Sequence, residues 1–357
     1  MEPNSSMTNS PINSQQVANG ILGGKVLAIT GGTGSFGSAL IRKLLLTQVS
    51  EIRIISRDED KQEKLLRHFM DPRIKCIVAD IRDREKMKTV LRKVDILFHA
   101  AALKQVPTGE FFPTEVIATN TLGSENILIA AVHNQIGKVV LLSTDKAVNP
   151  INAMGMSKAL MEKIGLSYAR LEDSNTSISI TRYGNVLCSR GSVIPKFVEQ
   201  RQLGQPITLT NGQMTRFLMS LDDAIELVFY AISSGQNGDT FIKQAPAATI
   251  SDLAVAVSRL VGSSPIEFNE VGIRYGEKIH ESLISDHEVP AVTSENGFFR
   301  IPLARNENNS IGNLGNTTIS QATEPYTSDS TMQLNIDQII KMLETNYEFN
   351  LLLNRQV

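Results

Sequence analysis

The sequence predicts an α/β fold built on a doubly wound parallel sheet. Short apolar segments, typical of buried strands, alternate with longer segments of helical periodicity over the first half of the chain. A glycine-rich turn directly follows the first apolar segment and opens the first helix. Beyond residue 183 the alternation ends, and loops and short strands are expected instead. We therefore expect a large parallel sheet followed by a smaller C-terminal part.

The order of the elements follows from this alternation. The expected strands cover residues 25–30, 51–56, 74–79, 95–98, 138–143 and 178–182. The expected helices run from the glycine-rich turn to 46, near 58–70, 83–92, 112–133 and 154–172, and over 222–233, 250–261 and 336–345. Outside these helices, segments 189–219 and 240–310 are expected to be irregular, with loops and short strands.

Length and composition suggest one large domain or two closely joined ones. Of the 357 residues, 1–23 are rich in Asn, Ser, Gln and Pro, and we expect a disordered extension there. Residues 24–183 form the expected sheet domain, 184–348 a smaller part interwoven with it, and 349–357 a tail. The stretch 304–330, rich in Asn, Ser and Thr, is expected to be an arm or loop that packs on a neighbouring molecule.

Composition argues against several classes of protein. The net charge of -2 gives no reason to expect nucleic acid or an anionic membrane as a partner. Cys76 and Cys188 lie far apart and indicate thiols in a reducing compartment. No apolar run approaches the ~20 residues that span a bilayer, and the N-terminus lacks a signal-peptide layout, so we expect a cytoplasmic protein. The five histidines show no metal-ligand spacing, and no metal site is predicted.

The glycine-rich turn predicts a dinucleotide site of the Rossmann type. Gly31 permits a tight turn, Gly34 lets the backbone approach a pyrophosphate, and Gly37 lets the helix lie close to the strand. The N-terminus of the helix offers unpaired N–H groups and a partial positive charge to phosphates. The site is also predicted to include Thr33, Ser35 and Phe36.

The end of the second strand favours NADP. A carboxylate at this point would bind an NAD ribose, but the chain has Ser56 and Arg57, followed by Lys61. The Arg57 guanidinium can pair with a 2′-phosphate through two parallel hydrogen bonds. The adjacent Asp58 leaves room for NAD. Further residues predicted to flank the cofactor are Asp80, Ile81, Ala100, Ala101 and Tyr183, the last with core packing as an equal alternative.

The segment from Ser143 to Lys158 holds the candidate catalytic residues. The fifth strand carries Thr144, Asp145 and Lys146 to its C-terminal edge, where ligands bind in such sheets. Asp145 and Lys146 are an adjacent acid and base. Both reach one ligand only if the strand has ended by Thr144, since neighbouring strand side chains point to opposite faces.

Taken with the glycine-rich turn, this segment resembles the extended short-chain dehydrogenase/reductase family. Within that family the chain is similar to the inverting UDP-N-acetylglucosamine 4,6-dehydratases, and most similar to their capsule-type dehydratase/5-epimerase branch. The matching strings lie at 99–107, 110–113, 119–126, 143–158, 181–186, 189–195, 214–217 and 272–278. The wider family carries Tyr-x-x-x-Lys, where this chain, like the capsule-type branch, has Met154 and Lys158. A thioether has no acidic proton, so Met154 cannot act as that base.

The resemblance implies a redox-neutral, NADP-dependent lyase that makes a 4-keto-6-deoxy UDP-sugar for surface polysaccharide such as capsule or O-antigen. NADP+ takes a hydride from C4, Lys146 removes the C5 proton, Asp145 protonates the leaving C6 hydroxyl, and the hydride returns to C6. To act as a base, Lys146 requires a lowered pKa. To act as an acid, Asp145 requires a raised pKa. Lys158 is implied to bind the nicotinamide ribose. Water, Thr144 or Asp145 would replace the missing tyrosine.

The resemblance also implies a UDP-sugar substrate and a homo-oligomer. Arginine forks suit diphosphate oxygens. The substrate-binding candidates are Arg190, Arg216 and Arg274 for the diphosphate, and Lys104, Asn185 and Glu277 for sugar or phosphate. A structural role is the alternative for each of them.

Two other functions compete with this interpretation. A UDP-sugar 4-epimerase would oxidise and re-reduce C4 without losing water, and it has no need of the pair Asp145 and Lys146. A non-catalytic protein that binds NADP or a nucleotide sugar would explain Met154. Retention of Asp145, Lys146 and Lys158 argues against such a binder.

Overall fold

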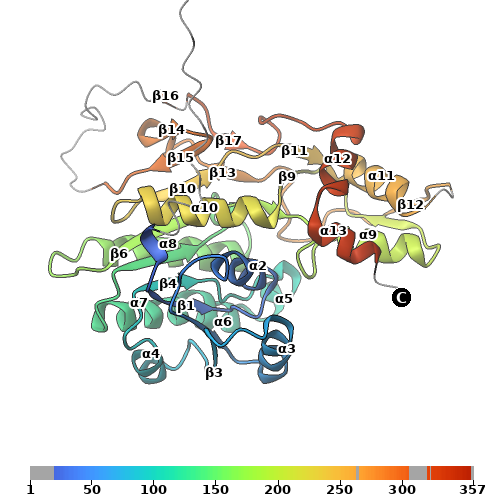
Figure 1. The fold of residues 1–357 in the computed structure, drawn as a ribbon. Coiled ribbons are helices and arrows are strands. Elements are labelled where there is room, and N and C mark those ends of the chain that lie inside the picture. Colours follow the sequence, from blue (N-terminus) through green and yellow to red (C-terminus); the bar gives the residue numbers. More distant parts are fainter. Residues whose placement is uncertain (1–19, 263–264, 305–319, 322, 355–357) are drawn as a thin grey trace, which may run out of the picture.

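The computed structural model describes residues 20–262, 265–304, 320–321 and 323–354. A ten-stranded sheet runs through them in the order β16-β14-β15-β10-β6-β5-β4-β1-β2-β3 (Figure 1). The strands from β10 to β3 pair in parallel, whereas β15, β14 and β16 join antiparallel. The order from β3 to β6 is that of a doubly wound sheet. The predicted fold class is confirmed.

The first six strands agree with the predicted ones to within one residue at each end. The main sheet contains β1 Val26–Thr30, β2 Glu51–Ser56, β3 Ile74–Val78, β4 Ile96–His99, β5 Lys138–Leu142, β6 Ser177–Arg182, β10 Thr240–Lys243, β14 Thr293–Glu295, β15 Phe298–Ile301 and β16 Ser320–Gln321. The smaller sheets contain β7 Asn185–Val186, β8 Ile207–Leu209, β9 Thr215–Met219, β11 Ala247–Thr249, β12 Phe268–Glu270, β13 Ser282–Ile284 and β17 Tyr326–Thr327.

Helices cover both faces of the main sheet. The α-helices are α2 Ser35–Leu44, α3 Glu59–Phe69, α4 Arg84–Val90, α5 Val106–Phe111, α6 Pro113–Val116, α7 Gly123–His133, α8 Ala153–Ala169, α9 Val193–Gln202, α10 Leu221–Ser234, α11 Ile250–Val261, α12 Ile336–Glu344 and α13 Tyr347–Leu353. The other helical segments are the π-helical η1 Ile117–Leu122 and the 3₁₀ turns η2 Asp145–Ala147 and η3 Val289–Ala291. The predicted helix over 112–133 is thus α6, η1 and α7 in succession.

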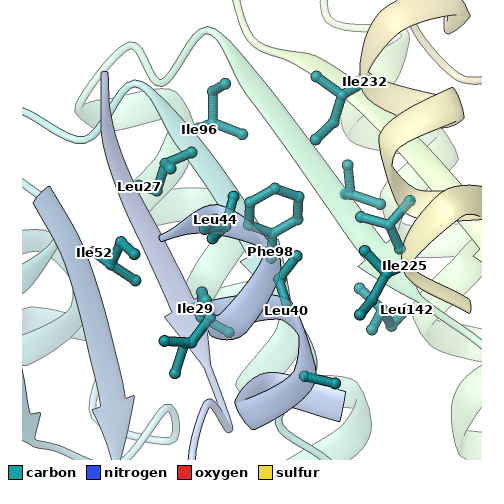
Figure 2. Close-up of a cluster of buried hydrophobic side chains, with 14 of the residues drawn as sticks. Leu27, Ile29, Leu40, Leu44, Ile52, Ile96, Phe98, Leu142, Ile225 and Ile232 are labelled. Carbon is teal, nitrogen blue, oxygen red and sulfur yellow. The ribbon is translucent and has the colours of Figure 1, made fainter. Parts of the chain in front are cut away.

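One apolar core lies between the sheet and helices α2 and α10. Phe98 of β4 is fully buried and lies among side chains of α2, such as Leu40 and Leu44, and of α10, such as Ile225 (Figure 2). A second core on the opposite face joins the sheet to α4, α7 and α8. Because both faces are covered, the central strands are apolar on both sides, which produced the clear strand signal in the sequence.

The C-terminal part has a core of its own. Side chains of α9, α11, α12 and α13 pack together there with those of β8 and β9. In Figure 1 these helices lie at one end of the molecule, beyond the main sheet. Strands β10, β14 and β15, also from beyond residue 183, extend the main sheet instead.

Two expectations for the chain termini differ from the structure, and the described part of 304–330 makes contacts within its own chain. The segment 349–357 was expected to be a tail, but α13 occupies Tyr347–Leu353 and Phe349 is fully buried. Within 304–330, Tyr326 packs on its own chain, and its hydroxyl donates to the Ala245 carbonyl at 2.8 Å. Leu22 is buried within the expected extension 1–23. Residues 1–19 and 305–319 lie outside the described residues.

Candidate functional site

A cavity of about 1110 Å³ opens at the carboxyl ends of β1, β4 and β5. This is the point at which the strand order reverses and where doubly wound sheets bind ligands. Its walls come from the sheet domain and from the C-terminal part alike. Every residue that the sequence proposes for the cofactor, the substrate or catalysis lines this cavity. The volume lies above the roughly 300–1,000 Å³ of sites for a single small ligand.

The glycine-rich turn is shaped by close backbone contacts. Gly31 has a φ of +69°, and a Cβ there would lie 2.8 Å from the Ala101 Cα. A Cβ on Gly37 would lie 2.3 Å from the Gly32 carbonyl oxygen. Helix α2 then begins without a side-chain cap and with no acidic residue in its first turn. Its N–H groups are therefore available to an anion such as a pyrophosphate.

The end of β2 forms the rim of the cavity. Ser56 Oγ accepts hydrogen bonds from Thr33 Oγ1 at 3.2 Å and from the Asp58 backbone N–H at 3.1 Å. The Lys61 ammonium pairs with Asp58 and, by hydrogen bonding to it, lowers the pKa of that carboxyl. Arg57 remains half exposed, with its guanidinium 3.6 Å from an Asp80 oxygen. Arg57 is thus the more available cation at this rim.

The loop after β4 is fixed by an amide from the π-helical segment. Asn120 accepts a hydrogen bond from the Leu103 N–H at 2.8 Å and donates to the Leu103 carbonyl at 2.9 Å. The same amide donates to Ser157 Oγ of α8 at 3.0 Å. The loop that carries Ala100 and Ala101 along the cavity is thereby tied to η1 and α8.

Strand β5 ends at Leu142, before the candidate acid and base. Thr144 caps η2, which begins at Asp145. This satisfies the condition that the strand end by Thr144, and both Asp145 and Lys146 line the cavity. Their side chains meet, with Lys146 Nζ 3.1 Å from Asp145 Oδ1.

The Asp145 carboxyl is almost completely buried, with its side chain 1% exposed. Oδ1 accepts a hydrogen bond from Thr144 Oγ1 at 2.8 Å, while Oδ2 has no hydrogen-bond partner in the protein. Burial raises the pKa of Asp145, opposed by the charge of Lys146 and assisted by the charge of Glu281. The environment therefore favours the protonated acid.

Lys146 contradicts the expectation of a lowered pKa. Burial alone acts in that direction, but the Asp145 and Glu281 carboxylates outweigh burial, and the pKa of Lys146 is raised. Lys146 Nζ lies 3.1 Å from Glu281 Oε1. Two carboxylates against one ammonium favour its charged form.

Sequence reasoning missed Glu281. It lines the cavity beside the candidate pair Asp145 and Lys146, and its side chain is 3% exposed. In the sequence it lies 135 residues beyond Lys146 (281 minus 146), in a segment expected to be irregular. The sequence feature that could have pointed to Glu281 is its position three residues after the matching string 272–278.

Helix α8 delivers Met154 and Lys158 to the same region. Asn152 caps it through a hydrogen bond from the Gly155 N–H at 2.8 Å. A Cβ on Gly155 would lie 2.2 Å from the Lys146 carbonyl oxygen, so glycine allows α8 to approach η2. Met154 is buried. Lys158 Nζ donates to the Leu142 carbonyl at 2.8 Å, and burial lowers its pKa to about 8.

The substrate-binding candidates differ in how far they are already engaged. Arg216 donates to the backbone carbonyls of Thr215, Ile279 and Lys278. Arg190 reaches the glycine-rich turn, with its guanidinium 3.3 Å from the Thr33 carbonyl.

The remaining candidates keep more capacity for a ligand. Arg274 is half exposed, with its guanidinium 4.0 Å from Glu277. Asn185 has a buried side-chain oxygen without a partner in the protein. Lys104 lies on the exposed rim. Tyr183 stacks on Phe36 at 6.4 Å between ring centroids and faces the cavity.

Histidine and metal chemistry contribute little to the described part of this site. His99 is fully buried between Thr30 and Ser124, at 2.7 and 2.8 Å, and burial lowers its pKa to about 3. It is therefore neutral and structural. Among the described residues, no group of three or more His, Cys, Asp or Glu side chains is arranged to hold a metal ion. Nor does any described helix have the length and apolarity needed to cross a membrane.

Comparison with known sequences gives close relatives over nearly the whole chain. A family model described as "Polysaccharide biosynthesis protein" matches residues 27–302. The protein named UDP-glucose 4-epimerase from Rickettsia akari (strain Hartford) is 47% identical over 328 residues, which are 90% of this chain and 96% of the relative. Its namesake from Rickettsia massiliae (strain Mtu5) is 46% identical over 327 residues, with the same coverage.

Solved structures share the architecture. The structure of Pen from Bacillus thuringiensis superposes with a TM-score of 0.86 at 30% identity, covering 92% of this chain and 99% of that one. DesIV, a dTDP-glucose 4,6-dehydratase from Streptomyces venezuelae solved with NAD and TYD bound, gives a TM-score of 0.64 at 24% identity and shares the fold, over 71% of this chain and 86% of its own. By the extent of the family match and the identity to its relatives, this chain belongs to the polysaccharide biosynthesis protein family.

Proposed function

We propose that the protein is an NADP-dependent UDP-N-acetylglucosamine 4,6-dehydratase that inverts C5 and makes a 4-keto-6-deoxy UDP-sugar for surface polysaccharide such as capsule or O-antigen. The family membership supports a role in polysaccharide biosynthesis. The relatives and structural neighbours named as nucleotide-sugar epimerases and dehydratases support that substrate class.

One observation carries the choice of a dehydratase. Asp145 is a buried carboxyl with a raised pKa, and it directly contacts the Lys146 ammonium inside the cavity. Loss of water needs an acid for the departing hydroxyl and a base for the neighbouring C–H bond. A 4-epimerase needs no such acid.

The residues present fit a nicotinamide dinucleotide. The backbone cradle at Gly31 and the uncapped start of α2 suit its pyrophosphate. Arg57 would hold the 2′-phosphate of NADP, and Lys158 the nicotinamide ribose. When bound, the cofactor would supply hydride transfer, taking a hydride from C4 of the sugar, which becomes a ketone, and returning it to C6 after water has left.

The protein then carries out the elimination. The C4 ketone acidifies the C5 proton, which Lys146 accepts. Protonated Asp145 donates its proton to the C6 hydroxyl, which leaves as water. Return of a proton to C5 on the opposite face gives the inverted centre. Asp145 thus acts as the acid, and its raised pKa favours the protonated form that this role needs.

Lys146→Ala is the variant that tests this assignment. The rate of water loss from UDP-N-acetylglucosamine is expected to fall by about 10²–10⁴-fold, measured by mass spectrometry of the sugar nucleotide. Lys64→Ala, which removes an exposed ammonium paired with Asp60 on α3, is the matched control. Water loss at the wild-type rate in Lys146→Ala would remove Lys146 from the mechanism.

A UDP-sugar 4-epimerase is the second candidate. Its support is the name of the Rickettsia relatives, which are 45–47% identical to this chain. An isomer of unchanged mass with inverted C4 would be its product.

A further inference from the structure

The proposed elimination requires a neutral Lys146, yet the site favours its charged form. The Nζ atom lies 3.1 Å from Asp145 Oδ1 and 3.1 Å from Glu281 Oε1. The pKa of Lys146 is raised because these two carboxylates outweigh the effect of burial. An ammonium cannot take a proton from C5, so the proton on Lys146 must first move to a nearby group.

Only two carboxylates among the described residues are in ion-pair contact with this ammonium. Asp145 cannot accept the proton of Lys146, because in the proposed mechanism it must itself be protonated to release the C6 hydroxyl. Burial already raises the pKa of Asp145. Glu281 is then the group left to receive the proton of Lys146.

Glu281 is built into the site on several sides. It lies just before β13, and its backbone N–H donates to Ser328 Oγ at 2.9 Å. Its Oε1 faces Lys146 of η2 and, at 3.9 Å, Arg216 Nε of β9. Its Oε2 is buried without a hydrogen-bond partner in the protein.

The charges around Glu281 keep it ionised in the absence of substrate. Burial opposes the charge, but Lys146, Arg216 and Lys278 outweigh burial and lower the pKa of Glu281. Asp145 is the acidic group on the opposite side of Lys146, and Tyr183 is a further titratable group near Asp145. Burial therefore favours the protonated form of Asp145, whereas the surrounding cations favour the ionised form of Glu281.

Resting on the function proposed above, we propose that Glu281 accepts the ammonium proton of Lys146 and so converts this lysine into the base for C5. Lys146–NH3+ and Glu281–COO− become Lys146–NH2 and Glu281–COOH. Lys146 then takes the C5 proton, Asp145 gives its proton to the C6 hydroxyl, and water leaves. Glu281 acts through Lys146 and is a positioning residue.

The test separates the steps of the reaction in deuterated water. Glu281→Gln keeps the shape of the side chain but cannot accept the proton. With UDP-N-acetylglucosamine and NADP+, reduction of the cofactor, read at 340 nm, is expected to stay within about tenfold of the wild type. Exchange of the C5 proton for deuterium, read by mass spectrometry, is expected to fall by about 10²–10⁴-fold. Glu281→Asp should recover part of the exchange.

Glu288→Gln provides the matched control. Glu288 forms a partly buried ion pair with Arg182 in the segment after β13 and does not line the cavity. Its loss should lower thermal stability without selectively slowing exchange at C5. A mere structural role for Glu281 would reduce cofactor reduction and C5 exchange together, as would misfolding, and either result overturns the proposal.

The outcome for the function itself is read from the wild type in the same experiment. If the wild type makes only a C4 epimer, the dehydratase proposal fails. If the wild type loses water and incorporates deuterium at C5 while Glu281→Gln exchanges at the same rate, the inference about Glu281 alone is wrong.

Discussion

Met154 is the residue at which this site departs most from the pattern Tyr-x-x-x-Lys. The side chain is buried at the start of α8 and lines the cavity. A thioether cannot exchange a proton, so its contribution is one of shape. In the proposed mechanism, proton transfer then falls to the neighbouring Asp145, Lys146 and Lys158.

Met154→Leu is therefore expected to remain active. Swapping methionine for leucine conserves volume and costs less than about 1.5 kcal/mol in such positions. The turnover rate should stay within about tenfold of the wild type, and its pH profile should not move, as measured by steady-state assays over a pH series. A loss as large as that of Lys146→Ala would mean that the sulfur takes part in the chemistry.

Asp145→Asn is expected to lose the elimination activity and to become more stable relative to the wild type as the pH rises. Because burial raises the pKa of Asp145, the folded state holds the proton more tightly than the unfolded chain. This contribution to stability is complete below the unfolded pKa of about 3.9. It is lost as pH rises through the folded pKa. Asparagine suffers no such loss, so the stability of the variant relative to the wild type should grow with pH.

Urea unfolding of both proteins at about pH 5 and about pH 8 measures this difference. At the higher pH, the free energy of unfolding of the Asn variant should increase relative to that of the wild type. The variant should also fail to eliminate water. A relative stability that falls with pH would show that Asp145 is stabilised as a carboxylate, and it would remove the argument for a protonated acid.

At the scale of the elements, an ion triad centred on the buried Arg182 joins three segments that hold the site. Arg182 of β6 pairs with Glu162 of α8 at 2.7 Å and with Glu288 near η3 at 2.8 Å. Helix α8 carries Met154 and Lys158, and the segment before Glu288 carries Glu281. The triad therefore holds α8 close to the segment that contains β13, which directly follows Glu281.

Glu162→Gln should destabilise the fold strongly. Removing one partner of a buried pair leaves the other charge uncompensated, at a cost of about 3–5 kcal/mol. Urea unfolding is the measurement, and Glu63→Gln is the control, because Glu63 forms an exposed pair with Arg67 on α3. Equal midpoints for the two variants would mean that the triad contributes little to stability.

Element positions were predictable where local pattern determines them. Strands β1 to β6 alternate with helices, and the central strands β1, β4, β5 and β6 are almost entirely buried, so apolar runs mark them within one residue. Helix α13 was missed because it follows α12 after a short break and draws its stability from the packing of Phe349. Its burial depends on tertiary contacts that no local signal carries.

At the scale of the whole molecule, the cavity joins the sheet domain to the C-terminal part. The glycine-rich turn and the 143–158 segment could be placed from sequence, since parallel strands bring their ends to one edge. Glu281 could not, because its contact with Lys146 depends on how the C-terminal segment folds back. The raised pKa of Lys146 has the same origin.

Cofactor choice should appear in the thermal stability of the whole protein. A ligand at 100 times its Kd adds about 2.7 kcal/mol to stability. NADP+ should therefore raise Tm, and Arg57→Ala should weaken NADP+ binding by roughly tenfold to a hundredfold through loss of a charged contact. The Tm gain with NAD+ should be the same in both proteins.

Arg67→Ala, which removes an exposed arginine of α3 outside the cavity, is the control for this series. Thermal unfolding with each cofactor at equal concentration provides the comparison. An equal loss of NADP+ and NAD+ binding in Arg57→Ala would show that Arg57 contacts a group present in both cofactors and not the 2′-phosphate.

The most direct test of the central claim is the mass of the product made from UDP-N-acetylglucosamine in deuterated water. The account predicts that wild-type protein with NADP+ releases one water and places one deuterium at C5. The same mass spectrum would contradict it by showing a sugar nucleotide that has kept its water and differs from the substrate only at C4.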